Sequence, residues 1–253
     1  MYAGFRLQVL MFRRSSDRIP ILIAIPFYVL IFMSVTRNAD RPDLEHHAIL
    51  APALAGIWTF ALLVASEIIE GDRWMGILET LVSSPASTLL VVAGRTVAVG
   101  VLSLVSFAET WLCALIFFGA DVRVPHPGWF FAGLLATCVA TVATSIVLAA
   151  LFVLGRSATL WQASLGYPFY VLGGIFVPAS LLPSWLHPVS DLIFLSWSAE
   201  LLRASLRPDP MPSAALRQLT MVLLIAAVTA IIGWLLTVRV LDRVRATGRV
   251  SLA

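Results

Sequence analysis

The sequence predicts an all-α integral membrane protein in which six transmembrane helices form a single domain. Composition is the first reason, because 60% of the residues are hydrophobic, 12% are charged and the mean hydropathy is +0.94. An ordinary soluble domain is nearer half apolar and a quarter charged, and a soluble fold could not bury this much apolar surface. The second reason is that apolar blocks recur along all 253 residues with no long polar stretch between them. We therefore expect one membrane domain over residues 1–253.

Six apolar blocks are long enough to span a bilayer, which takes roughly 17–25 mainly apolar residues. They are Ile19–Val35, Ile49–Ala65, Val97–Phe118, Trp129–Leu154, Leu160–Val177 and Leu219–Val238. The fifth block contains Pro168 and the pair Gly173–Gly174, which would kink or loosen a helix, although neighbouring helices compensate for such breaks inside a membrane bundle. The blocks therefore predict six spans.

Arginine placement predicts the orientation of these spans, since all 17 basic residues are arginine. One side, shared by both termini, carries Arg6, Arg13, Arg14, Arg18, Arg73, Arg95, Arg156, Arg239, Arg243, Arg245 and Arg249, and the other carries Arg37, Arg41, Arg123, Arg203, Arg207 and Arg217. The excess places both termini in the cytoplasm by the positive-inside rule. The preference for arginine over lysine fits a GC-rich bacterial genome, hence a bacterial plasma membrane. Because the arginines lie singly or in small clusters at block ends, we expect no nucleic-acid partner.

The first 18 residues predict a helix that lies in the membrane interface. Apolar residues recur there at helical spacing while the arginines fall off that stripe; the stripe consists of Tyr2, Phe5, Val9 and Phe12. A cytosolic lead-in without a defined role is the alternative. In either case this segment anchors the chain to membrane lipid and carries no chemistry.

Small residues repeat every fourth position along the fourth block. The two stripes are Gly133, Thr137, Thr141, Ser145 and Ala132, Ala136, Ala140, Thr144. Such stripes are typical of close helix packing in membranes. A polar solute path is the alternative, although threonine and serine hydroxyls usually bond within their own helix.

Residues 66–85, between the second and third blocks, predict a short amphipathic helix at the cytoplasmic surface. Their charged residues, Glu67, Glu70, Asp72, Arg73 and Glu79, make the segment too polar to enter the bilayer. On a helical wheel one face collects Trp74, Ile77, Leu78 and Leu81, with Glu79 opposite them. The helix should end before Pro85. Such a helix needs a partner surface.

This segment, SEIIEGDRWMGILETLVSSP, resembles the E-x-x-R-x-x-G-T-L-E-x-L-x-x-S-P signature of ABC transporter permeases of the drug and polysaccharide exporter type, the type-2 permease family. The matching positions are Glu70, Arg73, Gly76, Leu78, Glu79, Leu81, Ser84 and Pro85. Ile77 stands where the family often has threonine, and Asp72 replaces a glutamate. The resemblance implies that residues 66–85 couple the chain to an ATPase, through Glu70, Arg73, Trp74, Ile77, Leu78, Glu79 and Leu81.

A second stretch, GGIFVPASLLPSWLHPVSDLIFLSWSAELLRA, resembles the family's G-x-x-F-P-x-x-x-L-P-x-W-L segment and a following helix that ends in E-x-L-R. The matching positions are Gly174, Phe176, Pro178, Leu182, Pro183, Trp185, Leu186, Glu200 and Arg203, and Ser196 replaces a proline found in many relatives. The resemblance implies two half-helices that dip into the membrane from outside. Residues 178–207 are therefore expected to form an outer re-entrant segment, with Gly174, Pro178, Pro183 and Trp185 as its marker residues.

The resemblance also implies a function. Two six-helix permeases, either two copies of this chain or this chain and a similar one, would face each other across a pathway, and a cytosolic ATP-binding subunit would drive each. The sequence contains no G-x-x-x-x-G-K-[ST] phosphate-binding loop, so ATP and Mg are expected on the partner subunit and no cofactor on this chain. Short loops favour a small hydrophobic or amphipathic cargo of drug or antibiotic type; a polysaccharide or a lipid-linked molecule is the alternative.

Four single residues are candidates for the substrate pathway. Glu109 lies within the third block, where a carboxylate is functional by default, though a structural hydrogen bond is the alternative. Tyr167, Tyr170 and Phe176 suit a pathway that grips apolar solutes, and aromatic packing between helices explains them as well. The four histidines and two cysteines have no spacing typical of a metal site, and the sequence contains no enzyme motif. We expect a transporter subunit and no enzyme; a channel or a membrane scaffold would leave the charged amphipathic segment unexplained.

Overall fold

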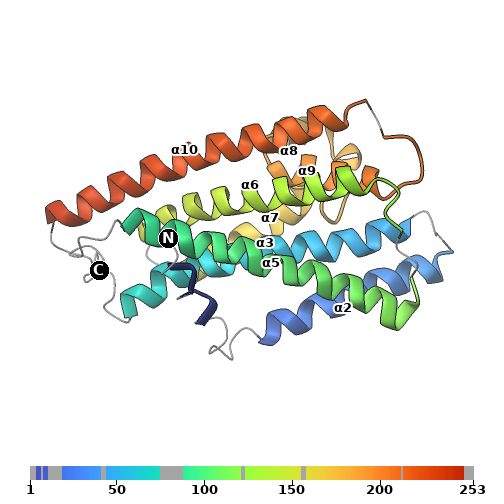
Figure 1. Ribbon diagram of the computed structural model, residues 1–253, viewed down its shortest axis with the longest axis horizontal. Helices are drawn as coiled ribbons and strands as arrows, with labels where there is room; N and C mark the ends of the chain where they lie inside the picture. The colour runs from blue at the N-terminus through green and yellow to red at the C-terminus, as the bar shows by residue number, and fades with distance from the viewer. Residues whose placement is uncertain are drawn as a thin grey trace.

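The computed structural model forms one elongated bundle of helices (Figure 1). The residues it describes are 4–6, 8–10, 19–40, 44–74, 88–120, 123–154, 158–211 and 213–247, and their regular structure is entirely helical. The long helices are α2 (Ile19–Asn38), α3 (Glu45–Trp74), α5 (Thr88–Phe118), α6 (Pro127–Leu154), α7 (Ala158–Leu172) and α10 (Ala215–Thr247). Successive long helices run in opposite directions along the bundle. Five of the six predicted blocks therefore lie wholly in helices, and the remaining one, the fifth along the chain, lies in α7 up to Leu172.

The ends of two helices differ from the prediction. The helix of the second block, α3, does not stop at Ala65 but continues without a break to Trp74, so the first half of the predicted amphipathic helix is an extension of the span. The helix of the fifth block ends at Leu172 and not at Val177. Gly174 ends it, because its φ of 65° is a left-handed conformation that glycine adopts without strain.

Apolar side chains cover the outside of the bundle as well as its core. Among the described residues, three helical stretches are long and apolar enough to cross a membrane, Gly94–Phe118, Pro127–Phe152 and Ala215–Arg239. Ala24–Asn38 and His46–Leu62 are shorter apolar helices. On α10 the exposed residues include Leu223, Leu224, Val228, Ile231 and Trp234. A soluble monomer rarely exposes so continuous an apolar surface, which is the surface that lipid requires.

Helix α3 is the centre of the bundle and packs against α2, α5, α6, α7 and α9. Its residues between Ala48 and Leu62 are almost all buried, and Trp58 stacks on Phe169 of α7 with ring centroids 4.3 Å apart. Helices approach closely where side chains are small: a Cβ added at Gly56 would lie 2.7 Å from the Cβ of Ser106 on α5. In lipid, this kind of close packing replaces the hydrophobic effect as the force between helices.

The small-residue stripes of α6 serve packing, as the sequence indicated. Thr137, Thr141 and Ser145 are buried, and each hydroxyl donates a hydrogen bond of 2.7–2.8 Å to the carbonyl four residues earlier. Their polar groups are thus satisfied within the helix and do not line a path. At Gly133 the side chains of Leu201 and Leu202 on α9 come within contact distance of the missing Cβ.

The chain between α7 and α10 folds into short helices beside one end of the bundle (Figure 1). These are η3 (Ala179–Leu181), η4 (Ser184–Leu186), α8 (His187–Asp191) and α9 (Phe194–Ser205). Of these, α9 is the most buried, and it packs against α6 and α10. The C-terminal end of α10 and the helical residues 4–6 and 8–10 lie toward the opposite end.

The N-terminal segment is anchored by a polar contact that the amphipathic stripe did not predict. Arg6 is exposed, as expected for a residue off the stripe, while Gln8 is buried. The side chain of Gln8 accepts a hydrogen bond of 3.0 Å from Nε of Arg95 on α5, and both residues are 1% exposed. The predicted anchor is thus tied to a spanning helix by a charge-assisted hydrogen bond. The rest of residues 1–18 lies outside the described residues.

Candidate functional site

Three of the seven ATPase-coupling residues predicted from the sequence lie at the end of α3. Glu70, Arg73 and Trp74 occupy its last two turns as a direct continuation of the buried helix. Ile77, Leu78, Glu79 and Leu81 lie outside the described residues. The structure therefore places the beginning of this segment on the central helix of the bundle.

The marker residues of the predicted re-entrant segment lie at the turns that follow α7. Gly174 has positive φ, Pro178 and Pro183 are the residues before η3 and η4, and Trp185 in η4 is exposed. Both prolines have extended backbone angles that interrupt helix formation. The prolines thus divide the segment into pieces too short to cross a bilayer.

Arg203, near the end of α9, holds the turn that ends α7. Its Nη2 donates to the carbonyl oxygen of Gly174 and, at 3.2 Å, to that of Ile175. The residue is 8% exposed, and burial lowers the pKa of Arg203 to about 10, so it stays protonated at neutral pH. Its Nε has no hydrogen-bond partner in the described part of the chain. The sequence placed Arg203 in a family motif but gave it no role.

The aromatic pathway candidates separate into an inner pair and an outer residue. The rings of Tyr170 and Phe176 lie 5.0 Å apart, and Phe176 stacks on Phe32 of α2 at 5.5 Å. The Tyr170 hydroxyl lies 2.6 Å from Oγ1 of Thr59, which ties α7 to α3. Tyr167 is 76% exposed and touches the pair only at its edge, with a centroid distance of 6.3 Å to Tyr170. The inner pair therefore packs α2, α3 and α7 together.

Glu109 does not join these aromatic residues. It lies on α5, is half-buried, and its Oε2 has no hydrogen-bond partner among the described residues. No described residue of α5 lines the pocket at the end of the bundle. The alternative interpretation of Glu109 is a structural hydrogen bond to another helix. Among the described residues, Oε2 makes no such bond.

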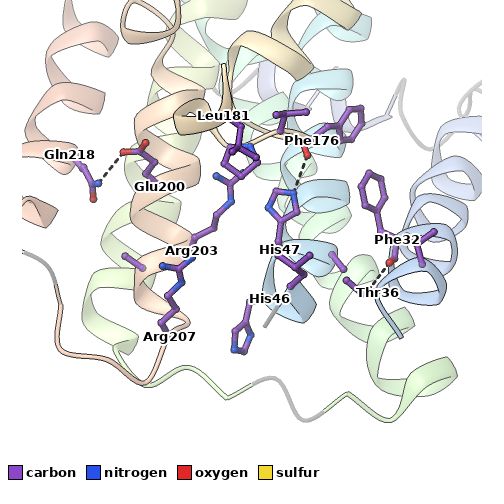
Figure 2. Close-up of a pocket in the computed structure, with 16 residues that line it drawn as sticks. Phe32, Thr36, His46, His47, Phe176, Leu181, Glu200, Arg203, Arg207 and Gln218 are labelled. Carbon is purple, nitrogen blue, oxygen red and sulfur yellow. Dashed lines mark hydrogen bonds between the residues drawn. The ribbon is translucent and has the colours of Figure 1, made fainter. Parts of the chain in front are cut away.

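A pocket of about 600 Å³ lies at the end of the bundle where α2 ends and α3 and α10 begin (Figure 2). One wall is apolar and the other polar; the lining residues are Phe32, Val35, Thr36, Leu44, His46, His47, Ala48, Phe176, Val177, Pro178, Leu181, Glu200, Arg203, Ala204, Arg207 and Gln218. His47 and Arg203 both point toward the turn around Phe176, and Nε2 of His47 lies 3.0 Å from the Phe176 carbonyl oxygen. Sequence reasoning did not predict this pocket, since its lining comes from five separate segments.

Comparison with known proteins assigns the chain to a family. The sequence model of the ABC-2 type transporter matches residues 4–206, which is most of the 253-residue chain. No curated protein matches the chain significantly. The matched range includes the end of α3 and the whole segment from α7 to α9, the two regions whose motifs predicted this assignment. The chain therefore belongs to the ABC-2 type transporter family, whose members are multi-pass membrane permease components of ABC exporters.

Proposed function

We propose that this chain is the membrane-spanning subunit of an ATP-driven exporter that moves a hydrophobic or amphipathic solute, of drug or antibiotic type, across a bacterial plasma membrane. Six helices cross the bilayer with both termini in the cytoplasm, and residues 178–207 re-enter from outside. A separate ATP-binding subunit carries ATP and Mg, and a second copy or a similar permease completes the pathway. Family membership supports the permease role, and the alternating direction of the six long helices supports the number of spans.

The length and composition of α3 carry the proposal. At 1.5 Å per residue its 30 residues extend about 45 Å, whereas the hydrocarbon core of a bilayer is about 30 Å thick. The excess of about 15 Å corresponds to about ten residues. The charged residues of α3 beyond its first turn, from Glu67 to Arg73, all fall within the last eight positions. This helix end therefore suits a position outside the membrane, where an ATP-binding subunit can contact it.

The packing of α3 gives this contact a mechanical consequence. A continuous helix transmits displacement along its axis, and α3 is in contact with five other helices. Two polar contacts link it to α7 and to the chain after it: Thr59, in the middle of α3, lies beside the Tyr170 hydroxyl, and His47, in the first turn of α3, lies beside the Phe176 carbonyl. Movement imposed at residues 66–85 is thus delivered to the centre of the permease. We infer that ATP-driven motion opens the pathway by this route.

The test is loss of ATPase association together with loss of export. In cells that coexpress the chain with an ATP-binding subunit from its own genome, Trp74→Ala and Leu78→Asp should leave an inserted, folded permease that copurifies little ATPase and exports little solute. Glu79→Arg should be milder, because a single charge at a contact rim contributes little. Trp234→Ala, an exposed tryptophan on α10, is the matched control and should behave as wild type. Full ATPase binding and export with Leu78→Asp would contradict the proposal.

A further inference from the structure

The pocket at the end of the bundle carries more positive than negative charge. Arg203, on α9, and Arg207, two residues after the end of α9 at Ser205, both reach it (Figure 2). Glu200 is the sole carboxylate among the described lining residues, and its Oε2 accepts a hydrogen bond of 3.2 Å from Nε2 of Gln218. The carboxylate thus binds Gln218 of α10, and its negative charge also acts on Arg203. The two guanidinium groups leave a net positive charge in the pocket.

Arg203 supplies a donor that the described part of the protein leaves unused. Its Nη2 is occupied by the carbonyls of Gly174 and Ile175, whereas Nε, buried in a residue that is 8% exposed, has no partner among the described residues. A buried N–H of a charged group without an acceptor is costly. An anion in the pocket would offset the charge of both arginines. Guanidinium groups bind phosphate and carboxylate oxygens with good geometry.

The facing wall of the pocket has the opposite chemistry. Phe32, Val35 and Ala48 come from α2 and α3, and Phe176, Val177 and Leu181 come from the chain after α7. Phe32 and Phe176 stack on each other and so present a fixed apolar surface. A volume of about 600 Å³ is within the range of sites that hold drug-sized ligands. The pocket thus combines a site for a negative charge with a surface for an apolar chain.

We propose that this pocket binds an anionic amphiphile, with its phosphate or carboxylate group on Arg203 and Arg207 and its apolar part against Phe32, Phe176 and Leu181. The ligand is either a membrane phospholipid or a solute in transit, since both present the same headgroup chemistry. The inference goes beyond the exporter role, because binding at this site requires neither an ATPase nor transport.

The experiment measures binding of dodecyl phosphate to the full chain in phosphatidylcholine nanodiscs by equilibrium dialysis, with empty nanodiscs subtracted. Wild-type protein should bind dodecyl phosphate at least about tenfold more tightly than inorganic phosphate or dodecyltrimethylammonium. Only dodecyl phosphate has both a negative group for the arginines and an apolar chain for the opposite wall. Equal affinity for dodecyl phosphate and dodecyltrimethylammonium would overturn the anionic site. Equal affinity for dodecyl phosphate and inorganic phosphate would overturn the role of the apolar wall.

Two exposed positions test the site without disturbing the fold. Arg207→Gln should weaken dodecyl phosphate binding about fivefold, as expected for one exposed charge, and Leu181→Glu, at a residue that is 72% exposed, should weaken it further by placing a carboxylate in the pocket. Arg217→Gln is the matched control, because Arg217 is an exposed outer arginine that lies over the Trp197 ring and does not line the pocket. Unchanged binding in both pocket variants would overturn the proposal.

Nanodiscs that contain phosphatidylglycerol distinguish the two sources of the ligand. If phosphatidylglycerol lowers the apparent affinity for dodecyl phosphate in wild-type protein but not in Leu181→Glu, the site is a lipid site. If phosphatidylglycerol has no effect on this affinity, while Arg207→Gln and Leu181→Glu still weaken binding of dodecyl phosphate, the site binds a soluble amphiphile. Both outcomes support an anionic amphiphile site, and neither depends on whether the ATPase binds at residues 66–85.

Discussion

Gly56 is the position at which the packing of the central helix is most open to a quantitative test. A Cβ at this position would lie 2.7 Å from the Cβ of Ser106 on α5, well short of the 3.4 Å at which ordinary contact begins. Forcing the two helices apart to relieve this overlap costs about 1–3 kcal/mol, whereas alanine favours the helix over glycine by about 1 kcal/mol. Gly56→Ala should therefore lower the free energy of unfolding by up to about 2 kcal/mol.

Ser106→Gly provides the compensating change. It removes the Cβ that would collide with the methyl group added at position 56, and the Ser106 hydroxyl has no hydrogen-bond partner among the described residues, so its loss breaks no described bond. The Ser106 carbonyl, which accepts a 2.7 Å hydrogen bond from Thr110, is retained. A double-mutant cycle cancels the helix propensities of both changes and isolates the contact. We expect a favourable coupling energy of about 1–3 kcal/mol.

The assay is unfolding by SDS in mixed micelles, followed by tryptophan fluorescence on purified protein. Gly128→Ala is the matched control, since nothing lies within 4 Å of the Cβ that it adds in the first turn of α6. It should not destabilise the protein. If the Gly56 and Ser106 changes are additive within about 0.5 kcal/mol, the close approach of α3 and α5 is not as described and the reasoning fails.

Two further predictions concern transport and topology. Glu109→Gln should leave expression at the wild-type level, because Oε2 has no hydrogen bond in the described structure that the amide would lose. It should lower export, because it removes a charge from the predicted pathway; wild-type transport at wild-type expression would remove Glu109 from the pathway. Single cysteines at Asp40 and Trp185 should react with an impermeant thiol reagent in intact cells, whereas cysteines at Asp17 and Arg245 should be shielded. Labelling of the last two from outside would reverse the orientation.

The helices of the bundle were predictable because hydropathy is a local property of the chain. Five of the six predicted blocks lie wholly in a helix, and most of the fifth block along the chain does. The stripes of α6 predicted packing correctly because hydroxyl bonding within a helix is also local. The predicted end of the second block, at Ala65, is not the end of its helix, α3. Charge excludes residues from lipid, but it does not stop a helix that continues into water. Polarity therefore predicts where the chain leaves the membrane, but it does not predict where the helix ends, at Trp74.

Contacts between distant segments were not predictable in this way. Gln8 and Arg95 are 87 residues apart, and no property of either segment indicates that one buries the other. Arg203 was placed in a motif, but its hydrogen bonds to Gly174 and Ile175 depend on how α9 returns to the turn after α7. Unpaired buried polar atoms and pockets lined by several segments are properties of the assembled fold, so sequence patterns do not register them.

The two proposed sites lie at opposite ends of one helix, and this has a consequence for how the permease would work. Residues 66–85 begin at the charged end of α3, while His47 at the other end lies 3.0 Å from the Phe176 carbonyl in the wall of the pocket. Arg203 holds the neighbouring carbonyls of the same turn. A shift of α3 along its axis therefore acts on the turn that Arg203 also binds, so a ligand on Arg203 and an ATPase on α3 would be coupled through that turn. If the anionic amphiphile and the ATPase favour different or equal positions of α3, each changes the affinity of the chain for the other. By linkage, the factor by which the amphiphile changes the affinity for the ATPase equals the factor by which the ATPase changes the affinity for the amphiphile.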